Sequence, residues 1–209
     1  IKWVECLPTG ELFAVTDLGL YQIEYTPTSA SIELLIPGAA ERKKNHLCYP
    51  KTISTGKDGS IWVSDDFGIG KYLSGEWTYF YLGKMNTTDC FLRAGCMVEF
   101  QNNTFAFAQK GNTYQLNSAQ DTFEPITLAS ELGQLNHVME HGDKVYFGTS
   151  SGLFSWDGNP NYTLEHLSEI ESSHFDWFDE NLYFGSWSKG LLQKSTQEDS
   201  LVTSLFDAK

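Results

Sequence analysis

The chain has 209 residues, a net charge of −13 and an aromatic content of 14%. Such acidity excludes sequence-independent binding to nucleic acid or to an anionic membrane, because neutralising phosphates requires clustered Lys and Arg. No apolar segment approaches the roughly 20 residues that a membrane-spanning helix needs, so direct insertion into a membrane is excluded as well.

One short pattern recurs five times: an apolar run, a polar turn that contains a glycine, and a second apolar run. The five copies begin at Gly10, Gly59, Asn103, Asp143 and Glu180. Their turn glycines are Gly19, Gly68, Gly111, Gly152 and Gly190. The spacings between these glycines are 49, 43, 41 and 38 residues, the period typical of four-stranded propeller blades. The repeat predicts an all-β fold, a five-bladed β-propeller of four-stranded antiparallel blades.

In chain order, the predicted blades span approximately residues 1–38, 49–83, 94–129, 135–168 and 172–207. We expect them to form one domain, either complete or excised from a longer protein. The strands expected in the first blade are Lys2–Leu7, Leu12–Thr16, Leu20–Tyr25 and Ile32–Ile36, each bounded by turn residues. The second strands of the blades are almost continuously apolar, which indicates sheets covered on both faces. Only residues 129–134 show a helical signal, and it is short.

The segment from Tyr49 to Phe80, YPKTISTGKDGSIWVSDDFGIGKYLSGEWTYF, resembles the two-component-regulator propeller repeat. The segments ELFAVTDLGLYQIEY and KVYFGTSSGLFSWDG are similar to this repeat more loosely. Such repeats form extracytoplasmic sensor domains, often with more blades, attached to histidine kinases or cyclic-dinucleotide enzymes. The resemblance therefore implies a sensor domain that is periplasmic or secreted.

Cysteines and glycosylation sequons also favour an exported chain. The sequence has four cysteines and three Asn-X-Thr sequons, which begin at Asn86, Asn102 and Asn161. Cys90 and Cys96 flank a short loop, and a local disulfide between them is a prediction that depends on export. No pair of cysteines has zinc-site spacing, and we expect neither a metal nor a cofactor.

The predicted first strands carry polar residues at matching positions. When these strands are aligned, one ring near the propeller axis is predicted to contain Glu5, Glu99, His137, His174 and Asp176. One interpretation is a cluster that binds a metal ion or acts in acid–base catalysis. The other is a hydrated channel with paired charges, which we favour because no compact ligand motif such as HExxH is present.

The turns between second and third strands supply another set of candidates. Trp187 lies in the turn GSWSKG, where a core role is hard to justify, and Asp66 lies in the corresponding turn of the second blade. The residues predicted to bind a ligand are Trp187, Asp66, His137, His174 and Asp176. Serine, thiol and nucleotide motifs are absent, so the sequence predicts non-enzymatic recognition of a small or glycan-like ligand, or of a partner protein, at a channel mouth. The alternative is a sugar-cleaving propeller hydrolase with Glu5, Glu99 and Asp176 as its catalytic carboxylates.

Overall fold

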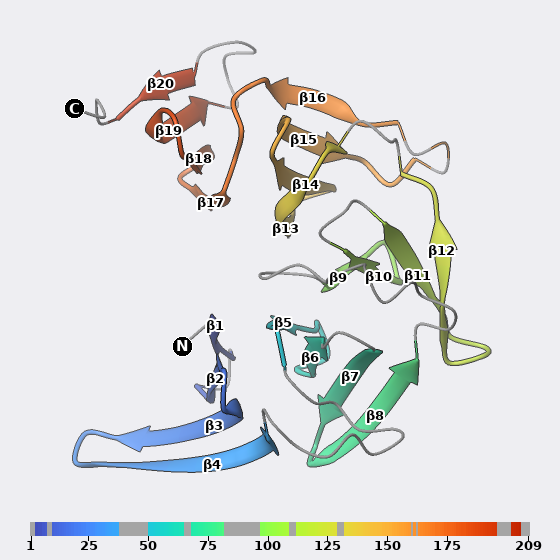
Figure 1. The fold of residues 1–209 in the computed structure, drawn as a ribbon, viewed down its shortest axis with the longest axis vertical. Coiled ribbons are helices and arrows are strands. Elements are labelled where there is room, and N and C mark those ends of the chain that lie inside the picture. Colours follow the sequence, from blue (N-terminus) through green and yellow to red (C-terminus); the bar gives the residue numbers. More distant parts are fainter. Residues whose placement is uncertain are drawn as a thin grey trace. The chain divides into compact units, whose positions relative to one another are not determined.

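The computed structural model describes residues 3–7, 10–37, 50–64, 68–81, 97–108, 112–128, 132–159, 161, 163–195 and 202–205 (Figure 1). These residues form twenty β-strands in five four-stranded antiparallel sheets, and in every sheet the strands pair in chain order. Sheets of this kind are the blades of a β-propeller, so the predicted five-bladed, all-β fold class is confirmed. The described ranges contain no α-helix, and hence no helix that is long and apolar enough to cross a membrane.

The chain divides into two compact units, residues 1–126 and 127–209. The strands of the first unit are β1 (Trp3–Cys6), β2 (Leu12–Thr16), β3 (Gly19–Thr26), β4 (Ser29–Pro37), β5 (Thr52–Thr55), β6 (Ile61–Ser64), β7 (Gly68–Leu73), β8 (Glu76–Tyr81), β9 (Met97–Phe100), β10 (Asn103–Phe107), β11 (Thr113–Asn117) and β12 (Thr122–Ile126). They make blades 1, 2 and 3.

The second unit contains blades 4 and 5. Its strands are β13 (Leu135–His141), β14 (Lys144–Thr149), β15 (Gly152–Trp156), β16 (Glu165–Ser168), β17 (His174–Phe178), β18 (Asn181–Ser186), β19 (Gly190–Ser195) and β20 (Val202–Ser204).

Apolar side chains pack between neighbouring blades within each unit. Between blades 1 and 2, the buried cluster comprises Leu7, Phe13, Val15, Leu20, Ile36, Ile53, Ile61 and Val63. Between blades 4 and 5, it comprises Leu153, Phe175, Leu182, Phe184 and Leu192. The middle strands of a blade are covered on both faces, as their continuous apolarity predicts; all four residues of β6 are buried.

Aromatic rings fill the space between blades 2 and 3. Trp62 is 1% exposed, and its ring centroid lies 5.6 Å from that of Phe80 and 6.4 Å from that of Phe123. Phe80 and Phe123 meet edge to face at 5.7 Å, a favourable geometry for aromatic pairs. This packing fixes the position of the Trp62 indole and therefore of its N–H group.

One hairpin extends beyond its predicted bounds. The hairpin of β3 and β4 continues past the predicted strands to the pair Thr26 and Ser29, where Thr26 Oγ1 accepts a hydrogen bond of 3.1 Å from the Ser29 N–H. Before β16, Asp157 Oδ1 accepts from the Asn159 N–H and Asn159 Oδ1 accepts from the Asn161 N–H, each at 2.9 Å, so two Asx turns follow one another.

Candidate functional site

The turn between β18 and β19 presents a large aromatic side chain to solvent. Trp187 is 87% exposed, which agrees with the interpretation that it has no role in the core. Trp156, by contrast, is 3% exposed and donates its indole N–H to the carbonyl of Asn159 at 3.1 Å. The exposed position of Trp187 follows from the turn, because residues 187–189 extend beyond the paired ends of the two strands.

Hydrogen bonds hold this turn in one conformation. Ser186 Oγ accepts from the N–H groups of Ser188 and Lys189 at 3.2 and 3.1 Å. Glu171, in the segment before β17, accepts from the Ser186 hydroxyl at 2.8 Å and from the Ser188 N–H at 2.9 Å. These hydrogen bonds from Ser188 and Ser186 lower the pKa of Glu171 to about 2. Trp187 is therefore carried on an organised turn, which reduces the entropy lost when a ligand binds it.

The first strands of blades 4 and 5 bring two predicted residues into contact. The rings of His137 and His174 stack with centroids 3.8 Å apart and an angle of 18° between their planes. His137 is 6% exposed, and its Nδ1 accepts a hydrogen bond of 3.3 Å from the Phe175 N–H. An Nδ1 atom that accepts a hydrogen bond carries no proton, so this His137 is neutral. Burial, with a smaller contribution from His174, lowers the pKa of His137 to about 3.

Asp176 lies two residues after His174 on β17. It is exposed, and its Oδ1 accepts a hydrogen bond of 2.7 Å from the Trp177 N–H. Burial lowers the pKa of His174, while the negative charge of Asp176 opposes that shift. The second unit thus brings together three of the five residues that the strand alignment predicted for one ring.

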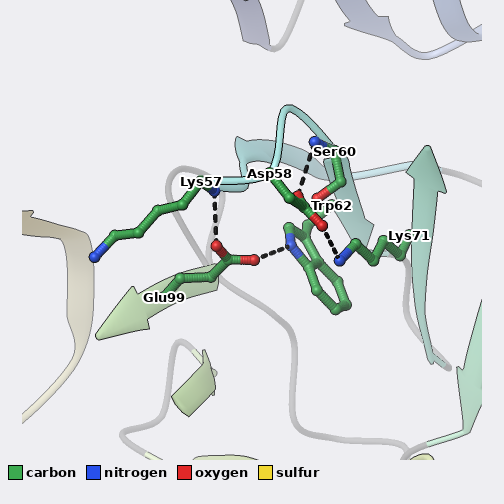
Figure 2. Close-up of polar contacts among 6 residues, drawn as sticks. All are labelled: Lys57, Asp58, Ser60, Trp62, Lys71 and Glu99. Carbon is green, nitrogen blue, oxygen red and sulfur yellow. Dashed lines mark hydrogen bonds and ion pairs between the residues drawn. The ribbon is translucent and has the colours of Figure 1, made fainter. Parts of the chain in front are cut away.

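Glu99 makes a link between blades 2 and 3 (Figure 2). Its Oε2 accepts a hydrogen bond of 2.7 Å from the backbone N–H of Lys57, and its Oε1 accepts one of 3.2 Å from the indole N–H of Trp62. Both carboxylate oxygens of this β9 residue are therefore used by the β5–β6 turn and by β6. The arrangement is that of a structural contact between blades, since it holds the position of a buried tryptophan.

An ion pair supports the same turn (Figure 2). Lys71 Nζ lies 2.6 Å from Asp58 Oδ2 and 5.0 Å from the centroid of the Trp62 ring, and Asp58 Oδ1 accepts from the Ser60 N–H at 3.0 Å. Burial opposes the charge of Asp58, but hydrogen bonds from Lys71 and Ser60 outweigh it and lower the pKa of Asp58 to about 2. The aspartate therefore stays ionised, and keeps its ion pair with Lys71, at pH values below the ordinary pKa of aspartate.

Glu5 also contacts its own strand. Its Oε2 accepts a hydrogen bond of 3.2 Å from the indole N–H of Trp3. Burial raises the pKa of Glu5, and the hydrogen bond from Trp3 partly offsets this. Because Glu5 and Glu99 belong to the first unit and the other three candidates to the second, a ring of all five stays a prediction. Within the described residues, no group of three or more His, Cys, Asp or Glu side chains is placed to hold a metal ion.

Three further candidates, Asp66, Cys90 and Cys96, lie outside the described residues. The predicted disulfide and the role of Asp66 therefore stay predictions. Sequence reasoning missed Glu171 as the residue that orders the Trp187 turn. Its signal was weak, because the acid lies 15 residues before Ser186 and only the pairing of β17 with β18 brings the two together.

No protein-family model and no curated protein matches the chain. Solved structures do match it. YCF48 bound to D1 peptide has a TM-score of 0.63 at 10% identity, over 93% of this chain and 65% of that one. An extracellular domain assigned to the one-component system BT4673 of B. thetaiotaomicron has a TM-score of 0.67 at 11% identity, over 97% of this chain and 30% of that one.

A third match is BBS1N in complex with ARL6DN, with a TM-score of 0.61 at 13% identity, over 93% of this chain and 61% of that one. The chain thus spans less than two thirds of the length of each of these three proteins. At such low identities the likeness shows the shared propeller fold.

Proposed function

We propose that this chain is a non-enzymatic recognition propeller that binds a partner polypeptide through the β18–β19 turn of blade 5. The observation that carries the proposal is the 87% exposure of Trp187 on a turn that Glu171 and Ser186 hold in place. Exposed tryptophans on ordered turns are among the residues that contribute most of the binding energy in protein interfaces. Two structural neighbours, in their complexes with D1 peptide and with ARL6DN, have polypeptide partners, which supports this class of ligand.

The charge of the chain limits the class of partner that it attracts. With a net charge of −13, long-range attraction favours a neutral or cationic polypeptide over an acidic one. We also propose that the chain is located outside the cytoplasm. This location is supported by the repeat that resembles sensor propellers, and by the likeness in fold to an extracellular domain.

A glycan is the second candidate ligand, since an exposed indole ring can stack on a sugar face as well as on a peptide side chain. The test is to select binders from a random peptide library and from an oligosaccharide panel with the purified full chain. The matched variants are Trp187→Ala and Trp77→Ala. The second removes a tryptophan that is 38% exposed and whose ring centroid lies 5.0 Å from that of Tyr72.

We expect peptides whose binding is weakened about tenfold or more by Trp187→Ala and is unchanged by Trp77→Ala. Saturable binding of oligosaccharides with the same dependence on Trp187 would show that the ligand is a glycan and not a polypeptide. Release of sugar products from the panel would instead support the hydrolase alternative. If no library yields a ligand that depends on Trp187, the proposed site is wrong.

A further inference from the structure

The hairpin of β3 and β4 carries an apolar face with exposed side chains. Directly opposite residues on paired strands share a face, and the pairs here are Tyr21 with Leu34, Ile23 with Ile32, and Tyr25 with Ala30. We call these six residues the hairpin apolar face. Tyr25, Ile32 and Leu34 are 61%, 67% and 48% exposed, although the side chains are of the kind that usually pack in a sheet interior.

This face lies on the side of blade 1 that points away from blade 2. Phe13, Val15 and Leu20 pack in the cluster shared with blade 2, and Tyr21 pairs with Ala14 on the opposite side of the sheet. The side toward blade 2 becomes polar along the hairpin, where Gln22 pairs with Glu33, and Glu24 pairs with Ser31. The hairpin is therefore amphipathic, with an apolar face and a face that carries two carboxylates.

The outer edge of this hairpin has the length needed to take up another strand. β4 has nine residues, whereas the outermost strands of the other blades, β8, β12, β16 and β20, have six, five, four and three. In the described part of the chain no strand pairs with the outer edge of β4. Short length and lysines are what commonly protect a free edge, and β4 contains no lysine, with Pro37 only at its end.

The charged side chains of blade 1 within residues 3–37 are all acidic. Residues 3–37 contain five acidic side chains, Glu5, Glu11, Asp17, Glu24 and Glu33, and neither lysine nor arginine. An acidic partner strand would be repelled along the whole hairpin, while a basic one would be attracted. A second copy of this acidic blade is disfavoured for the same reason.

We propose that β4 binds an extended segment of a partner polypeptide in which apolar and basic residues alternate, added to blade 1 as a fifth strand. Side chains alternate between the two faces of a strand, so the apolar residues of the segment would contact Ile32 and Leu34 while its Lys or Arg residues would lie beside Glu33. Backbone hydrogen bonds along β4 would supply affinity, and the two faces would supply specificity. This surface belongs to the first unit, and the Trp187 turn belongs to the second.

The test uses the full chain and a nine-residue peptide that alternates valine and lysine, matched in length to β4. A peptide that alternates valine and glutamate is the control ligand. We expect saturable binding of the lysine peptide alone, weakened by added salt because the attraction is between charges. Amide hydrogen exchange should slow at alternate residues of β4, since every second N–H of an edge strand points outward.

Matched variants test both faces. Ile32→Lys should weaken binding about tenfold or more, while Leu18→Lys, at a 73% exposed position of the same blade, should not. Glu33→Lys should weaken binding to a similar extent, while Glu76→Lys, at the start of the outer strand of blade 2, should not. These positions are exposed, so the variants are expected to fold, and circular dichroism checks that they do.

The proposal is overturned if neither peptide binds, if the glutamate peptide binds equally well, or if each variant behaves like its control. It is also overturned if sedimentation shows that the chain dimerises and that Ile32→Lys abolishes the dimer, because the occupant is then a second copy. Trp187→Ala tests the proposed function, whereas Ile32→Lys and Glu33→Lys test the binding of the lysine peptide to β4. The two proposals can therefore fail separately.

Discussion

His137 and His174 lie face to face, 3.8 Å between ring centroids, on the first strands of two neighbouring blades. The Phe175 N–H donates to His137 Nδ1, so the contact requires a neutral imidazole. A proton on that nitrogen would break the hydrogen bond and place a charge in a buried site beside a second histidine. The packing of blade 5 on blade 4 is thus linked to the protonation state of His137.

This link predicts that the protein loses stability in acid. The pKa of His137 is about 3 in the folded state and about 6.5 in an unfolded chain, so below pH 6.5 the unfolded state takes up a proton that the folded state does not. The stabilisation is complete above about pH 6.5 and is lost progressively as the pH falls toward 3. From this group alone, the free energy of unfolding should be about 2 kcal/mol lower at pH 5 than at pH 8.

Urea unfolding between pH 5 and pH 8 measures this dependence. His137→Gln, whose side-chain carbonyl can accept from the Phe175 N–H, should remove much of it. His166→Gln is the control, because His166 stacks on Phe154 within blade 4 rather than between blades. An unchanged slope in His137→Gln would contradict the assignment to His137.

Glu99→Gln should destabilise the first unit. The two oxygens of Glu99 accept from the exposed Lys57 N–H and from the indole N–H of the buried Trp62, and an amide has only one oxygen, so one of these two donors loses its acceptor. The expected loss is about 1–3 kcal/mol in the free energy of unfolding, measured by urea denaturation. Glu124→Gln, which alters an exposed contact with Asn117 in the same blade, should have little effect. If Glu99→Gln leaves the stability unchanged but abolishes turnover of a glycoside, Glu99 has a catalytic role.

Gly56→Ala should disturb the contact between Glu99 and the β5–β6 turn through a change in the turn. A Cβ atom at this position would meet Ser60 Oγ, and it would come within 2.9 Å of both Asp58 Oδ1 and Glu99 Oε1. These three side chains must then move, which disturbs the hydrogen bonds they make, with an expected destabilisation of about 1–3 kcal/mol. Because the alanine acts on Glu99, the double variant Gly56→Ala, Glu99→Gln should lose less than the sum of the single losses. Additive losses in urea denaturation would show that the two positions are independent.

The Trp187 turn should keep its hydrogen bonds in mild acid. The pKa of Glu171 is lowered to about 2 in the folded state, so this carboxylate stays ionised well below the usual range for glutamate, and the turn is lost only as the pH falls through that value. The chemical shift of the Ser188 amide, which donates to Glu171, reports the change directly. It should be constant from pH 7 to pH 4 and change below about pH 3. A titration centred on the ordinary pKa of glutamate would contradict the lowered value.

The blades themselves are encoded locally. The glycines at turn positions and the apolar runs on either side predict five hairpins, because strand periodicity and turn geometry depend on residues that are close in sequence. The same reasoning identified Trp187 as a residue outside the core, since its neighbours are turn residues. That the five blades make one domain stays a prediction.

Tertiary structure decided the contacts of the polar candidates. Glu99 looked like any other carboxylate on a first strand until the packing of blade 3 on blade 2 placed it against Lys57 and Trp62, 42 and 37 residues away. His137 met His174 only through the packing of blades 4 and 5. The alternation of Tyr21, Ile23 and Tyr25 is visible in the sequence, yet the same alternation suits a buried face and an exposed one. Local periodicity sets which face of a strand is apolar, whereas contacts between residues distant in sequence decide what, if anything, covers it.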